Sequence, residues 1–89
     1  MIRTTTWTVD VFLTEEDGRT RADAVLRSGA GRELRGVGHA RRNPADREIP
    51  EIGDEIAVSR ALSELAHRLL DAAAGDIEAV TGHASRLSS

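Results

Sequence analysis

Apolar and polar residues alternate along the N-terminal part of the chain. Trp7, Val9, Val11 and Leu13 occupy every second position of residues 7–13. A period of two places these four side chains on one face of a β-strand. We therefore expect a strand whose apolar face is buried.

The pair Asp17-Gly18 follows this run and predicts a hairpin. Both central residues of a two-residue type I′ turn take positive φ, which Asp and Gly tolerate. Pairing Glu16 with Arg19 sets a register in which the apolar faces of the two strands coincide, as register selection requires. The inner pairs of this register are Val9–Leu26, Val11–Ala24 and Leu13–Ala22.

A glycine-rich turn at residues 29–31 predicts a second hairpin and a third strand near residues 33–41. We expect Ser28 to lie opposite Arg32. Small residues then line the middle of the inner face, so a helix can lie close to it. The inner rows become Val9–Leu26–Leu34, Val11–Ala24–Gly36 and Leu13–Ala22–Gly38.

An amphipathic helix is indicated in the C-terminal half. Pro50 and the acids that follow it predict a start between Glu51 and Asp54. About 20 residues at 1.5 Å each span roughly 30 Å, the length of a nine-residue strand, so one helix can cover the sheet. Its apolar residues recur at spacings of three and four, which predicts one buried stripe. The stripe consists of Val58, Leu62, Leu65, Leu69 and Ala72.

Two features concern the end of this helix. Gly75 with Asp76 indicates a stop and a new start, so that Ile77 and Val80 belong either to a short terminal helix or to a bent continuation. Trp7 is expected in the core, where it covers the end of the sheet beneath the C-terminal half of the helix.

Together these elements predict an α+β fold, a three-stranded antiparallel β-meander packed on one long C-terminal helix in the order β-β-β-α. At 89 residues the chain fits a single domain, residues 1–89, because two domains would each approach the roughly 40-residue lower limit for independent folding. We expect an ordered core of about residues 5–81 and a tail, residues 82–89, that frays.

The composition excludes several classes of chemistry. The chain has no cysteine, which removes disulfides, thiolate metal sites and a cysteine nucleophile. No run approaches the roughly 20 apolar residues that span a bilayer, and the N-terminus lacks the apolar segment of a signal peptide. We expect a cytoplasmic protein that does not bind membranes and needs no cofactor.

Candidate catalytic groups are few. His39, His67 and His83 lack metal-ligand spacing, and each is expected to be a solvated side chain. Acids near the predicted helix start either pair for acid–base work or stabilise the positive end of the helix dipole, which we favour. These acids are Glu48, Glu51, Asp54 and Glu55. We therefore expect no enzyme, no catalytic residue and no metal site.

Charge is divided along the chain. Residues 19–47 carry eight arginines and three acids, whereas residues 48–78 carry eight acids and two arginines. An arginine-rich outer sheet face could attract phosphate. The alternative, which we favour, is a solvated face with cross-strand ion pairs. The candidate phosphate contacts are Arg21, Arg27, Arg35, Arg41 and Arg42.

The outer face also carries a modest apolar spot. Phe12, Val25 and Val37 lie on this face in the predicted register. Exposed apolar residues of this kind mark contacts between proteins. We therefore name these three residues as candidate interaction residues.

Several runs resemble a family of small actinobacterial proteins of unknown function. They are Trp7-Thr8-Val9, Asp17-Gly18-Arg19-Thr20-Arg21-Ala22, Asn43-Pro44-Ala45-Asp46-Arg47, Pro50-Glu51-Ile52-Gly53-Asp54-Glu55 and Ala61-Leu62-Ser63-Glu64-Leu65-Ala66. The resemblance covers about residues 5–80 and implies a fold similar to the double-stranded-RNA-binding domain, with β-β-β-α order. It brings no catalytic residue, cofactor or ligand.

The chain departs from RNA-binding members of that fold at two places. Too few residues precede Trp7 for the first helix of the domain, and acids stand at the start of the last helix, where the RNA-binding motif has lysines. Our leading hypothesis is a non-enzymatic module that binds a protein partner or itself through its sheet. The alternative is RNA binding through the arginine-rich face.

Overall fold

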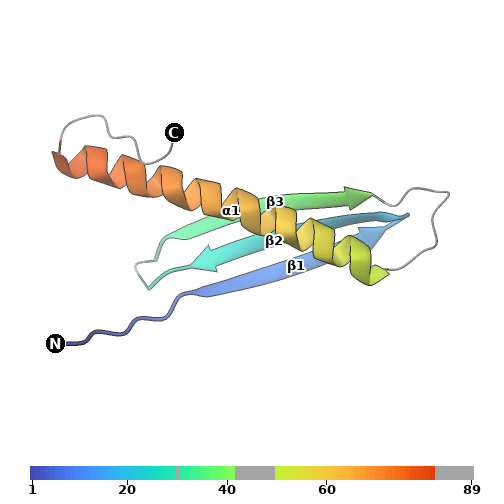
Figure 1. Cartoon of the computed structure of the whole chain (residues 1–89), viewed down its shortest axis with the longest axis horizontal. Helices are drawn as coiled ribbons and strands as arrows, with labels where there is room; N and C mark the ends of the chain where they lie inside the picture. The colour runs from blue at the N-terminus through green and yellow to red at the C-terminus, as the bar shows by residue number, and fades with distance from the viewer. Residues whose placement is uncertain (30, 42–49, 82–89) are drawn as a thin grey trace.

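The computed structural model describes residues 1–29, 31–41 and 50–81. It contains strands β1 (Thr8–Glu16), β2 (Arg19–Arg27) and β3 (Glu33–Arg41), followed by helix α1 (Pro50–Thr81). The strands form one antiparallel sheet in the order β1-β2-β3, and α1 packs on one of its faces (Figure 1). The predicted α+β fold with β-β-β-α order is confirmed. The predicted tail, residues 82–89, lies outside the described residues.

Both hairpins have the predicted register. Asp17 and Gly18 take φ values of 50° and 72°, as a type I′ turn requires, and Glu16 pairs with Arg19. In the second hairpin the Ser28 amide donates to the Arg32 carbonyl at 3.4 Å, and nearby Gly31 has φ 79°. The three inner rows from Val9–Leu26–Leu34 to Leu13–Ala22–Gly38 are therefore all formed.

Helix α1 is longer than the pattern predicted. It begins at Pro50, one residue before the predicted range, because proline suits the first turn, where its missing amide costs nothing. Of the two alternatives left open at Gly75, the structure shows a continuation, because the helix runs through Gly75 to Thr81. A glycine inside a helix costs only about 1 kcal/mol. Asp76 also accepts a hydrogen bond from Arg32 in the β2–β3 connection at 2.9 Å, which holds this part of the helix.

The core lies between α1 and strands β2 and β3. Ala57 and Ala61 are fully buried against Gly36 and Gly38. A Cβ atom added to Gly36 would lie 2.5 Å from the Leu65 amide nitrogen, and one added to Gly38 would collide with the backbone of Ala57 and Ala61. The glycines therefore let the helix approach β3 at backbone distance, the packing role predicted for them.

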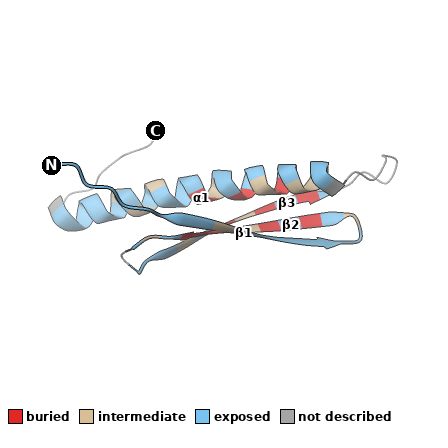
Figure 2. Ribbon diagram, turned by 90° about the horizontal axis from the view of Figure 1, so that it is seen from below, coloured by how far each residue is buried: buried red, intermediate tan, exposed pale blue. Residues whose placement is uncertain are grey.

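This close approach rolls the helix away from β1. Figure 2 shows buried residues on β2, β3 and the N-terminal half of α1, while β1 is exposed along its length. Ala57, Ala61 and Leu65 form the buried row of the helix, whereas Leu62 and Leu69 of the predicted stripe remain 41% and 36% exposed. The prediction that this stripe is buried throughout is therefore wrong at Leu62 and Leu69.

Candidate association surface

Arg60 fixes the orientation of α1 about its axis. Its Nη1 atom donates to the main-chain oxygen of His39 on β3 at 2.7 Å, so this flank of the helix faces the β3 edge. Leu62 and Leu69 lie two helical turns apart on the same face of α1, and this face is on the side of the helix opposite Arg60. That side of the helix faces the β1 side of the sheet, where Leu69 and Trp7 line one groove of about 400 Å³.

The inner side chains of β1 are uncovered because α1 lies elsewhere. Trp7 is 54% exposed, so the prediction of a core tryptophan is wrong, although the residue does lie beneath the C-terminal half of the helix. Together with the leucines of α1, these side chains form what we call the apolar strip. Its members and their exposed fractions are Trp7 54%, Val9 42%, Val11 37%, Leu13 44%, Leu62 41% and Leu69 36%.

The buried core of the described chain is small by comparison. Five of the seven residues in the buried cluster between α1 and the sheet are alanines, and the two larger ones are Leu26 and Leu65. Burial of leucine-sized side chains stabilises a fold by about 1.5–3 kcal/mol each, whereas alanine contributes much less. The apolar strip therefore contains six large apolar side chains, whereas the buried cluster contains two.

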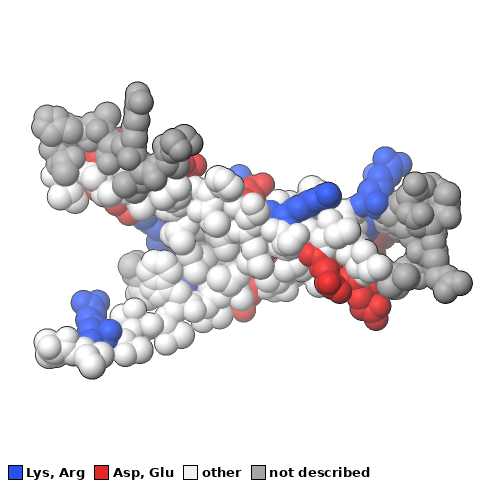
Figure 3. All heavy atoms as spheres, viewed as in Figure 1, with Lys and Arg blue, Asp and Glu red and all other residues white. Residues whose placement is uncertain are grey.

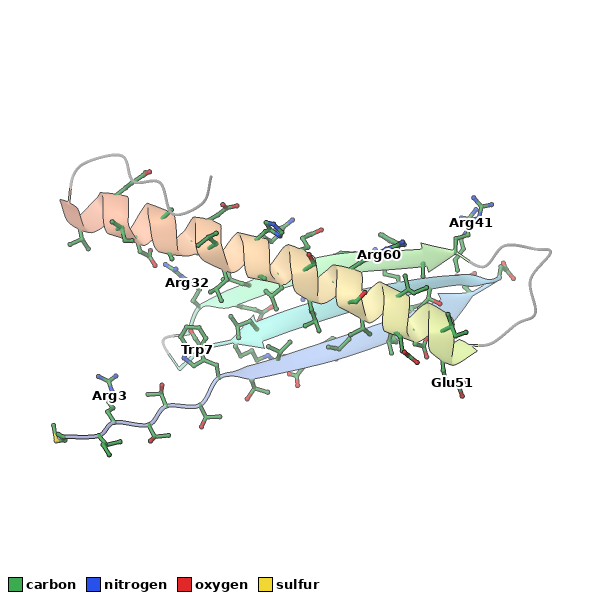
Figure 4. The ribbon with its side chains drawn as sticks, in the orientation of Figure 1. Arg3, Trp7, Arg32, Arg41, Glu51 and Arg60 are labelled. Carbon is green, nitrogen blue, oxygen red and sulfur yellow. The ribbon has the colours of Figure 1, made fainter. Side chains whose placement is uncertain are left out.

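Opposite charges stand at the two ends of the apolar strip. Arg3 lies beyond the N-terminal end of β1, and Glu51 lies where α1 begins, near the C-terminal end of β1 (Figure 4). Glu55, one turn further along the helix, is also exposed. Figure 3 shows an uncharged surface between the acids at one end and the arginine at the other.

The predicted interaction spot on the outer face is smaller than expected. Phe12 is 53% exposed and Val37 is half-buried, but Val25 is only 1% exposed. Val25 lies on the central strand between Asp10 on β1 and Arg35 on β3, so it has neighbouring strands on both sides. The prediction that Val25 contributes exposed surface is therefore wrong.

Three of the candidate phosphate contacts are paired with acids. The Arg21–Asp23 pair closes at 3.1 Å, and its hydrogen bond lowers the pKa of Asp23, with smaller contributions from Arg35 and His39. Arg27 lies 3.8 Å from Asp10, and Arg35 lies 3.5 Å from Glu33. Arg27–Asp10 is a cross-strand pair of the kind that we favoured, whereas the other two pairs each lie within a single strand.

Arg41, another candidate phosphate contact, lies at the end of the sheet near the β1–β2 hairpin. Arg41 and Arg19 are cross-strand neighbours, and they line a wide hollow of about 1030 Å³ together with the acids Glu16 and Asp17. Arg21, Arg60 and His39 also line the hollow, so its basic side chains outnumber the two acids. Arg42 lies outside the described residues.

The candidate catalytic groups do not converge. No group of three His, Cys, Asp or Glu side chains that could hold a metal ion occurs in the described residues. His39 and His67 lie on different elements, and the Ser63 carbonyl lies 2.8 Å from Nδ1 of His67. Of the acids at the helix start, Glu51 and Glu55 are exposed, whereas Asp54 has a buried Oδ1 atom that lacks a hydrogen-bond partner in the described part of the chain. His83 and Glu48 lie outside it.

The apolar strip was not predicted as an exposed surface. Alternation in β1 and the helical stripe both indicated burial, and each pattern is the same whether another element of this chain or a second chain covers the residues. One signal could have revealed it. Ala57 and Ala61 share a helical face, and Gly36 and Gly38 share a strand face, so the smallest residues on each element determine the line of closest approach.

No helix of the described residues is long and apolar enough to cross a membrane.

Comparisons with known proteins agree with the predicted resemblance. The chain is 57% identical over 81 residues to the uncharacterised protein Mb1767 of Mycobacterium bovis, which covers 91% of this chain and 85% of that protein. It is 53% identical over 73 residues to the uncharacterised protein Rv2632c of Mycobacterium tuberculosis, 82% of this chain and 77% of that protein.

The fold matches a solved structure as well. The crystal structure of Rv2632c superimposes with a TM-score of 0.82 at 49% sequence identity, covering 92% of this chain and 96% of that one. The sequence also matches the family described as Rv2632c-like over residues 5–86, nearly the whole chain. The protein therefore belongs to the Rv2632c-like family.

Proposed function

We propose that the protein is a non-enzymatic association module that binds another protein chain, in the first place a second copy of itself, through the apolar strip. One observation carries the proposal: the six large apolar side chains of the apolar strip, on or beside β1 and on α1, are between 36% and 54% exposed. Contiguous exposed apolar surface of this kind marks interaction sites in proteins.

The small core supports the same proposal. Domains of this size bury only about 60% of their surface when they fold alone, so each large side chain left in water matters to their stability. A partner that covers the apolar strip would bury side chains that this chain leaves partly exposed. Covering the outer face, which is lined with ion pairs, would bury less apolar surface.

RNA binding through the arginine-rich face has less support. Arg21, Arg27 and Arg35 each have a carboxylate within 3.8 Å. Phosphate would have to compete with those acids. The exposed Glu51 and Glu55 at the start of α1 would repel a nucleic-acid backbone that approached there.

Two adjacent residues of β1 test the proposal. Leu13 belongs to the apolar strip, whereas Phe12 points to the outer face and is just as exposed. We expect wild-type protein to scatter light as a dimer after size exclusion at micromolar concentration. Leu13→Lys should be monomeric, because the substitution places a charge inside the contact, and Phe12→Lys should remain a dimer.

The same run gives the opposing outcomes. A wild-type monomer at every concentration would refute self-association. Loss of the dimer in Phe12→Lys but not in Leu13→Lys would move the interface to the outer face. A complex with short duplex RNA, weakening steeply between low and moderate salt, would favour the arginine-rich face instead.

A further inference from the structure

The free edge of β1 carries unpaired backbone groups at the residues of the apolar strip. In a two-residue hairpin, the residues flanking the turn exchange both main-chain hydrogen bonds, and this bonding alternates along the strand. Since Glu16 pairs with Arg19, even-numbered residues of β1 direct their main-chain groups toward β2. The amides of Val9, Val11 and Leu13 therefore point away from the sheet.

The two edges of the sheet are treated differently. On β3, Arg60 reaches from the helix and donates a hydrogen bond to the main-chain oxygen of His39, so that one outward group of this edge is occupied. Natural edge strands are commonly protected in such ways, by charges, prolines, bulges or a covering element. On β1, the residues with outward amides are Val9, Val11 and Leu13, which are apolar, and β2 is the only strand beside them in the described sheet.

Charge at the ends of the apolar strip selects a direction of pairing. Arg3 marks the N-terminal end of β1, and Glu51 with Glu55 marks the other end. A two-fold axis reverses one strand relative to its copy, so each basic end meets the acidic end of the other chain. A parallel arrangement would place like charges together.

We propose that two copies of the chain join β1 to β1 in antiparallel fashion, forming a six-stranded sheet with both helices on the same face. This inference rests on the proposed self-association and specifies its geometry. Outward amides and carbonyls of the two β1 strands pair across the axis. The inner side chains of both strands become a continuous apolar floor between the two helices.

Cross-linking distinguishes this geometry from a face-to-face dimer. The chain has no cysteine, so single-cysteine variants report one position in each copy. Asp10→Cys and Phe12→Cys lie on the outer face near the middle of β1. In the edge-paired dimer their thiols lie on the same side of one sheet, and a short bis-maleimide should join them. In a face-to-face dimer the outer faces point away from each other.

Val37→Cys is the matched control. Val37 also lies on the outer face, but on β3, two strands away from the proposed axis. It should remain uncross-linked under the same conditions. Cross-linking at Val37 that equals that at Phe12 would contradict edge pairing.

Hydrogen exchange supplies a second readout on unmodified protein. The amides of Val9 and Val11 should exchange at least about tenfold more slowly in the wild-type dimer than in monomeric Leu13→Lys, because they are hydrogen-bonded only across the dimer axis. A dimer with fast exchange at both amides and no cross-link at either β1 cysteine would overturn edge pairing while self-association stood. A wild-type monomer would overturn both.

Discussion

The two sides of the sheet differ in how they meet the helix. On the β3 side, Gly36 and Gly38 let the backbones approach closely, and Arg60 bonds to the strand edge. On the β1 side, Val9, Val11 and Leu13 remain partly exposed, and the facing helix flank is exposed too. The exposed β1 side of the sheet therefore carries large apolar side chains, whereas glycines lie where the helix packs against β3.

The difference teaches that close packing and apolar character are separate requirements. A helix settles where its backbone can come nearest to the sheet, since many small dispersion contacts are gained there. Larger apolar side chains offer more area to bury, but they also keep the helix backbone farther from the sheet. The apolar surface left over then becomes available to another chain.

Adding a side chain at Gly38, where α1 packs closest to β3, should cause the largest loss of stability. Gly38→Ala places a methyl group against the backbone of Ala57 and Ala61, where nothing can yield without moving the helix. We expect a loss of about 3 kcal/mol in the free energy of unfolding, measured by urea titration. Gly29→Ala is the control, because nothing lies within 4 Å of its added Cβ. A Gly38→Ala protein as stable as the Gly29→Ala protein would contradict the packing described.

Truncating one leucine on each side of α1 should give the next largest effect. Leu65 is 5% exposed in the core, and Leu65→Ala should cost about 2–5 kcal/mol at any protein concentration. Leu62 belongs to the apolar strip. Leu62→Ala should therefore cost more in concentrated than in dilute samples, because its burial depends on the second chain. If both variants lost the same free energy of unfolding at every protein concentration, the distinction between the buried core and the apolar strip would be wrong.

Acid should produce the smallest effect. Arg32 lowers the pKa of Asp76 through a hydrogen bond and an ion pair of 2.9 Å that joins the β2–β3 connection to α1. A carboxyl whose pKa is lower in the folded chain stabilises the fold above its unfolded value, about 3.9, and loses that contribution as pH falls through the folded value. Thermal melts should show a slightly steeper decline below about pH 4 for wild type than for Asp76→Asn.

The partner residue provides the control for this measurement. Arg32→Gln should remove the same part of the pH dependence, since either substitution breaks the pair. The difference should be modest, because both side chains are at least half exposed and solvent screens their interaction. A wild-type decline that matches both variants would show that the pair contributes nothing.

Local patterns predicted most of the fold. The Asp17-Gly18 turn, the strand register, the third strand and the helix start within one residue all follow from short-range rules. At Gly75 the same rules left a stop and a continuation open, and the helix continues there, where Asp76 contacts Arg32, 44 positions away in the sequence. The arginine face was read correctly as an ion-paired surface at Arg21, Arg27 and Arg35.

The sequence alone determined which side chains share each face, because periodicity in strands and helices follows from backbone geometry. Only the tertiary structure decided which of those faces are covered. A helix is about 10–12 Å across, and strands lie about 4.8 Å apart, so one helix covers about two strands of a three-stranded sheet. Because Gly36 and Gly38 allow the closest approach of the backbones, the helix lies over β3 and β2. The apolar row of β1 is left uncovered for that reason.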